Sequence, residues 1–170
     1  MDRGTFVDLD GRPAVRFERT YSHPPERVWS AITEPAELAH WFPATVSLEH
    51  RVGGTIEFTG DPNIDPGSGT VLEFDPPRRL AYTWGRDELH FRLEPTDDGG
   101  CTVTFFDVLE ARDAAARNAA GWTVCLVELG KHVSGAVADG PHSATAEPWQ
   151  PQYDDYVAAG MPAGAPIPGR

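Results

Sequence analysis

Short runs of alternating apolar and polar residues cover most of the first two thirds of this chain. Between residues 14 and 21, Val15 and Phe17 alternate with Arg16 and Glu18, which is the period-two pattern of a half-buried strand. Later runs of the same kind are separated by glycine, proline and aspartate clusters that are typical of turns. They predict further strands near 44–49, 53–59, 69–75, 78–85, 87–95 and 101–109. We therefore expect a meander of antiparallel strands.

Helical periodicity appears before and after this meander. Residues 25–32 and 35–42 each begin with proline and place apolar side chains at steps of three and four, which predicts two short helices. From residue 113 to 133 one apolar stripe continues for about five turns and predicts a long helix that lies on the sheet. Aromatic residues within 147–157 predict a short docked helix.

A long helix laid across a strongly curved sheet leaves a space between the two. Strand alternation and the helix stripe point one aromatic, sparsely polar set of side chains toward that space, which suits a pocket for a small apolar molecule. Packing in a core explains large aromatic residues as well. The predicted ligand-binding residues are Trp41, Phe42, Phe58, Tyr82, Trp84, Phe91, Phe105, Asp107, Trp122, Cys125, Leu126 and Leu129.

Asp107 is the position with most chemical interest. Alternation through Val103 and Phe105 points its carboxyl group inward, where desolvation would raise the pKa and suit the group to acid or base catalysis. Alternatively, Asp107 sits at the pocket mouth, or a bulge turns it outward. Tyr82 is the second catalytic candidate, as a hydrogen-bond donor to a carbonyl oxygen.

Composition and charge remove several classes of function. The 170 residues suit one domain, and a formal charge of -12 leaves no electrostatic footprint for nucleic acid or an anionic membrane surface. The start of the chain lacks the features of a signal peptide, and no apolar run reaches the length that a bilayer requires. We expect a cytoplasmic protein without membrane insertion.

The histidines and cysteines predict no metal site. No two histidines have ligand spacing, and Cys101 and Cys125 are far apart, so neither a zinc site nor a disulfide framework is expected. A nucleophilic Cys125 would require a nearby cation or histidine that the sequence does not supply. We expect no cofactor and no metal.

Several motifs in order carry a resemblance to a known family. They are residues 21–29, 33–42, 75–84 and 91–95, followed by Gly121 and Trp122 with the leucines that come after them. Together these resemble the START-like (SRPBCC) superfamily, in the branch named after the carboxy-terminal domain of the Hsp90 ATPase activator (AHSA1-like). The resemblance implies an α+β helix-grip fold, in which a curved antiparallel sheet wraps around a long C-terminal helix, with two short helices after the first strand and a deep cavity.

The resemblance leaves the activity open, because relatives include lipid carriers, polyketide cyclases and cochaperones. The first hypothesis is a module that binds a small apolar or aromatic molecule in the cavity. The second is a cyclase, aromatase or hydrolase that acts on a carbonyl substrate. The third is an Hsp90-activator-like cochaperone or interaction module, disfavoured because only thirteen or so residues precede the first predicted strand.

The expected domain organisation is a single START-like domain over residues 1–160 and a disordered tail over 161–170, where the sequence has no periodicity. A homodimer through an exposed strand or through the tail is possible.

Overall fold

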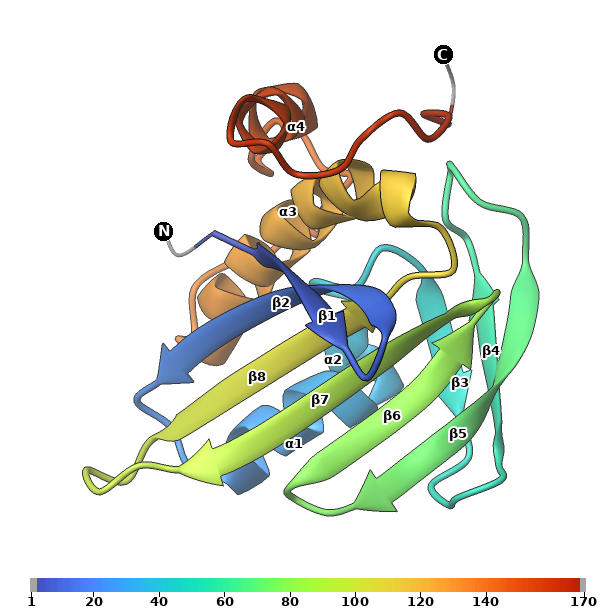
Figure 1. Cartoon of the computed structure of the whole chain (residues 1–170). Helices are drawn as coiled ribbons and strands as arrows, with labels where there is room; N and C mark the ends of the chain where they lie inside the picture. The colour runs from blue at the N-terminus through green and yellow to red at the C-terminus, as the bar shows by residue number, and fades with distance from the viewer. Residues whose placement is uncertain (1–2, 169–170) are drawn as a thin grey trace.

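Eight antiparallel strands form one curved sheet in the computed structural model, which describes residues 3–168 (Figure 1). The order across the sheet is β1-β2-β8-β7-β6-β5-β4-β3, so the first two strands pair with the last one. The strands are β1 (Thr5–Leu9), β2 (Arg12–Tyr21), β3 (Thr45–Leu48), β4 (Thr55–Thr59), β5 (Gly67–Asp75), β6 (Arg79–Trp84), β7 (Asp87–Pro95) and β8 (Cys101–Val108).

The strand β1 corrects the sequence analysis, which placed the first strand at residues 14–21. Asp10 and Gly11 both have positive φ, at 54° and 84°, which is the backbone of the two-residue turn that joins twisted hairpin strands. Asp8 supports the turn by accepting a hydrogen bond from the Gly11 amide. The Asp10-Gly11 pair was therefore a hairpin signal, and the two short helices follow the second strand rather than the first.

Three helices lie against the same face of the sheet, and a fourth packs on the outside (Figure 1). Proline opens both α1 (Pro25–Thr33) and α2 (Pro35–Leu38), where a missing amide hydrogen costs nothing. The predicted second helix is shorter than expected, because turns replace it beyond Leu38. A 3₁₀ turn, η1 (Arg112–Ala114), leads into α3 (Ala115–Val133), and α4 (Trp149–Ala158) lies on α3.

Buried aromatic side chains fill much of the space between the sheet and α3. Phe91 stacks on Phe105 with ring centroids 4.7 Å apart, and Trp41 meets Phe91 edge to face at 6.4 Å. The indole nitrogen of Trp41 donates a hydrogen bond to the backbone carbonyl of Ala31, which ties this ring to α1. The fold is the expected α+β helix grip, with a core of packed rings behind α3.

The predicted docked helix is present as α4, and the segment after it also has defined contacts. The amide of Ala116 donates to the carbonyl of Pro162, and the amide of Ala165 donates to the carbonyl of Asp113. Residues 161–168, for which the sequence predicted disorder, thus lie against the start of α3, while 169–170 fall outside the described residues. None of the helices within residues 3–168 is long and apolar enough to cross a bilayer.

Candidate functional site

A pocket of about 620 Å³ lies where the ends of β6, β7 and β8 approach the first half of α3. The β4–β5 loop, the α3–α4 loop, α4 and the C-terminal segment complete its rim. Its lining includes Trp84, Leu89, Trp122, Val124 and Trp149 as apolar walls. Its polar lining comes from Asp61, Asn63, Asp87, Asp107, Arg117, Asn118 and His142.

Two tryptophans form the wall nearest the core. Trp84 and Trp122 meet nearly edge to face, with ring centroids 6.2 Å apart. Phe58 stacks behind Trp84 at 4.6 Å, and Phe105 packs against Trp122 at 4.9 Å. Because each indole is supported by another ring, this wall is rigid and presents a large aromatic surface to the pocket.

Asp107 brings a buried carboxyl group to this wall. Its side chain is 1% exposed, and its Oδ2 atom accepts hydrogen bonds from Trp122 Nε1 at 2.9 Å and Asn118 Nδ2 at 3.1 Å. Its Oδ1 atom is buried and receives no hydrogen bond from the described part of the chain. The inward orientation that strand alternation predicts for Asp107 agrees with this burial, and its place next to the end of β8 on the pocket lining also fits the alternative of a position at the pocket mouth.

Asp87 is the neighbour that the sequence analysis missed. Its Oδ2 accepts a hydrogen bond from Asn118 Nδ2 at 3.2 Å, and its Oδ1 accepts one from the Glu110 amide at 2.9 Å. Burial raises the pKa of Asp107 well above its ordinary value, and the charge of Asp87 and a hydrogen bond shared with it raise that pKa further. The carboxyl group of Asp107 therefore favours its protonated form.

Arg117 orients the amide that joins the two acids. Its Nε donates to Asn118 Oδ1 at 3.0 Å, and its Nη1 donates to the Pro166 carbonyl at 2.8 Å. With the amide oxygen engaged in this way, the amide nitrogen faces both carboxylates. Arg117 thus has its own partners at the rim, and the C-terminal segment contributes one of them.

The twelve predicted ligand-binding residues divide into two groups. Trp84, Asp107, Trp122 and Cys125 line the pocket. The other eight lie in the packed core: Trp41, Phe42, Phe58, Tyr82, Phe91, Phe105, Leu126 and Leu129.

The candidate catalytic Tyr82 is among the core residues. Its ring lies between those of Phe58 and Phe91, at centroid distances of 6.0 and 6.2 Å. Burial raises the pKa of its hydroxyl group above the ordinary value. Tyr82 is not among the residues that line the pocket with Asp107.

Of the two site residues that the sequence analysis missed, Asn118 had a recognisable signal in its helical spacing, whereas the signal at Asp87 was weaker. Asn118 precedes Trp122 by four positions, so both side chains lie on one face of α3. Asp87 follows Gly85 and Arg86, where a polar residue is ordinarily explained by the turn alone. Only the pairing of β7 with β8 brings Asp87 close to residue 107.

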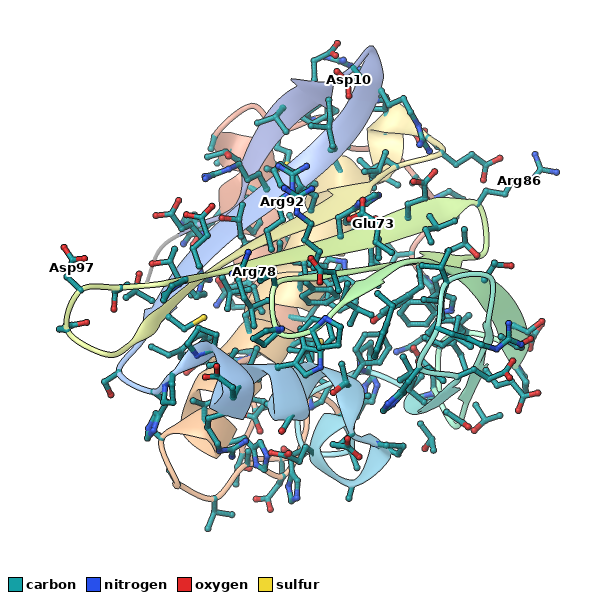
Figure 2. The ribbon with its side chains drawn as sticks, turned by 90° about the horizontal axis from the view of Figure 1, so that it is seen from below. Asp10, Glu73, Arg78, Arg86, Arg92 and Asp97 are labelled. Carbon is teal, nitrogen blue, oxygen red and sulfur yellow. The ribbon has the colours of Figure 1, made fainter. Side chains whose placement is uncertain are left out.

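The chain also has a second, larger pocket with different chemistry. It measures about 790 Å³ and lies at the opposite end of the sheet, among Pro24, Pro77, Arg78, Arg92 and Gly99. Figure 2 shows Arg78 and Arg92 over the sheet, away from the end that carries Arg86. The pocket walls lack the aromatic surface and the buried acid of the first pocket, which we therefore treat as the candidate site.

No group of three or more histidine, cysteine, aspartate or glutamate side chains within residues 3–168 could hold a metal ion. Cys125 lines the pocket, but burial raises the pKa of its thiol, which disfavours the thiolate form that a nucleophile requires.

Comparisons with known proteins show which family and which solved structures this chain is similar to. A family model described as activator of Hsp90 ATPase homolog 1-like protein matches residues 22–134. A conserved protein of unknown function from Enterococcus faecalis is similar in structure with a TM-score of 0.75 at 21% identity, covering 92% of this chain and 89% of that one. No curated protein matches the chain.

Two further solved structures share the fold. CalU16 from Micromonospora echinospora, in its solution structure, has a TM-score of 0.69 at 24% identity and covers 92% of each chain. The structure described as the Aha1 dimer from Colwellia psychrerythraea has a TM-score of 0.60 at 22% identity, covering 71% of this chain and 95% of that one.

Proposed function

We propose, from the premise that the chain belongs to the activator of Hsp90 ATPase homolog 1-like family, that this member binds a small apolar or aromatic molecule. The proposed site is the pocket between α3 and the ends of β6, β7 and β8. One observation carries the proposal: a supported wall of Trp84 and Trp122 stands beside a buried carboxyl oxygen of Asp107 that has no hydrogen-bond partner in the described part of the chain.

This combination is what a ligand site requires. Aromatic surface stabilises a bound molecule by removing apolar area from water, at roughly 25 cal/mol per Å². A few buried polar atoms then orient the molecule. The rings behind the wall, including Phe58 and Phe105, support the proposed site rather than touch the ligand.

A filled-pocket variant tests the proposal. Gly121 lines the pocket on α3, and a Cβ atom added there meets no atom within 4 Å. We expect Gly121→Leu to fold at least as well as the natural chain, because leucine favours a helix more than glycine does, and to lose ligand binding. Gly130→Leu is the matched control, since Gly130 is on the same helix, has equally open space and lies outside the pocket.

The measurement is native mass spectrometry of each purified variant against its denatured mass, followed by identification of any molecule released. Retention of the same molecule by Gly121→Leu would contradict the assignment of the pocket. If the natural chain carries nothing, titration with aromatic probes replaces extraction, and the two glycine variants serve the same comparison.

Acid catalysis is a second candidate function, and the raised pKa of Asp107 at the pocket wall favours it. A protonated Asp107 could donate its proton to the carbonyl oxygen of a polyketide-like substrate and so stabilise the negative charge that develops there. Replacement by asparagine keeps the shape and removes the proton. Unchanged turnover in Asp107→Asn would exclude this role.

The family name also suggests an interaction module, and one relative is described as a dimer. We keep homodimerisation and a cytoplasmic location as proposals. Light scattering across a concentration series would decide the oligomeric state.

A further inference from the structure

The unpartnered oxygen of Asp107 defines what the ligand must bring to the pocket. All three donors near the acid pair are already engaged: Trp122 Nε1 and Asn118 Nδ2 serve Oδ2 of Asp107, and the Glu110 amide serves Asp87. Asp107 Oδ1 is buried and receives no hydrogen bond from any donor within residues 3–168. A buried carboxylate oxygen without a donor is costly, so Asp107 either keeps its proton or receives an N–H or O–H donor from a ligand.

The charges around the pocket select among such donors. Asp61, Asp87 and Asp107 contribute carboxyl groups to the lining, against one arginine and one histidine. Arg117 is bonded to Asn118 and to Pro166, and His142 contacts the carbonyl of Pro43. A carboxylate ligand would meet the acid pair beside a guanidinium that already donates to two oxygens, whereas a cation would meet two carboxyl groups.

We propose that the ligand is an organic amine, whose protonated nitrogen donates a hydrogen bond to Asp107 Oδ1 while its apolar body lies against Trp84 and Trp122. This inference rests on the proposed function and deepens it. The cation takes the place of the proton that Asp107 otherwise holds, so it supplies a donor to Oδ1 and offsets the repulsion between the carboxylates of Asp87 and Asp107. The body of the ligand uses the aromatic wall described above.

The test compares three probes that share one apolar body and differ in the head group: naphthylethylamine, naphthylethanol and naphthylacetate. Isothermal titration calorimetry at neutral pH measures each affinity. We expect the amine to bind at least about tenfold more tightly than the acetate, because like charges placed together are strongly unfavourable. The neutral alcohol should fall between them.

Variants of Asp107 and Asp87 test whether these two acids cause the preference for the amine. Asp107→Asn should lower the affinity for the amine by about tenfold and leave the affinity for the alcohol within about threefold, because only the cation uses the charge. Asp87→Asn should act in the same direction and covers the case in which Asp107→Asn folds poorly. Asp97→Asn is the control for the charge change: Asp97 is exposed at the tip of the β7–β8 turn, at the end of the sheet away from Arg86 (Figure 2).

Three results would overturn the inference. They are equal or tighter binding of the acetate, equal or tighter binding of the alcohol, and absence of binding by the amine. Binding of the alcohol or the acetate instead would leave the proposed ligand site standing and reject only the amine. Loss of every probe together with an empty native mass spectrum would count against both proposals.

Discussion

At the scale of single residues, the chemistry of this protein centres on Asp107. Trp122 and Asn118 donate hydrogen bonds to one oxygen of its side chain, and the other oxygen is buried without a hydrogen-bond partner among residues 3–168. Burial raises its pKa well above the ordinary value of 3.8, and Asp87 raises it further. The same geometry affects folding stability, because protonation of Asp107 is linked to unfolding.

Protonated Asp107 stabilises the folded chain most at acid pH. Between the ordinary pKa and the raised one, the folded chain holds a proton that the unfolded chain has lost, so the stability contributed by protonated Asp107 is full below pH 3.8 and is lost as pH rises through the folded value. We expect Asp107→Asn to lose less stability than the natural chain from acid to neutral pH. Denaturant unfolding at a series of pH values measures this, with Asp97→Asn as the control, and parallel curves for all three would contradict it.

Tyr82 gives the contrasting prediction. It lies among the rings of the core and is not among the pocket residues, so its hydroxyl group should not contact a ligand. We expect Tyr82→Phe to leave probe affinity within about twofold, at a stability change of about 1 kcal/mol. Calorimetric titration with the naphthyl probes checks the first value, and a tenfold loss of affinity would restore Tyr82 to the site.

At the scale of elements, α4 joins both ends of the described chain. The Tyr156 hydroxyl oxygen lies 2.7 Å from Thr123 Oγ1 on α3 and accepts a hydrogen bond from the Gly4 amide at 2.8 Å. Tyr156 is 2% exposed, so these groups have no ready access to water. One side chain therefore links α4, α3 and the segment before β1.

Tyr156→Phe should therefore lower the free energy of unfolding by about 1–3 kcal/mol, the cost of leaving a buried donor unsatisfied. Tyr153→Phe is the matched control on the same helix, since Tyr153 is only half buried and stacks on Trp149 through its ring. We expect the control to change stability by no more than about 0.5 kcal/mol. Equal effects of the two variants in urea unfolding would show that the Tyr156 hydroxyl does not link the three elements.

Patterns between neighbouring residues predicted the helices and most of the strands. Prolines at the start of α1 and α2 and the apolar stripe of α3 are signals within one turn or two. The strand β1 was missed because it has only five residues. The Asp10-Gly11 turn follows it at once, so the segment was interpreted as an irregular lead-in to β2.

At the scale of the whole molecule, the C-terminal part completes the pocket. Trp149, Ile167 and Pro168 line it, although the family model ends at residue 134. The Arg117 contact with Pro166 links the same segment to the residue that orients Asn118. The tail thus belongs to the candidate site.

Deletion of residues 147–170 should lower the free energy of unfolding by about 3 kcal/mol or more, because it removes the buried Tyr156 ring from the core. It should also weaken binding of any ligand that the full chain retains, since one wall of the pocket is lost. Thermal unfolding and native mass spectrometry of the shortened chain test both effects. An unchanged melting temperature would indicate that the tail is not docked in solution.

The sequence by itself determined the helices, most of the strands and the aromatic inward face, and it offered the inward position of Asp107 as one of its alternatives, because periodicities of two and of about 3.6 residues are properties of neighbouring positions. Only the tertiary structure decided which aromatic rings pack and which line a pocket. That division depends on how closely α3 approaches the sheet, so Phe91 and Phe105 are covered while Trp84 and Trp122 remain at an opening. The acid pair is decided at the same level, since Asp87, Asp107 and Asn118 come from β7, β8 and α3 and meet only when these elements pack together.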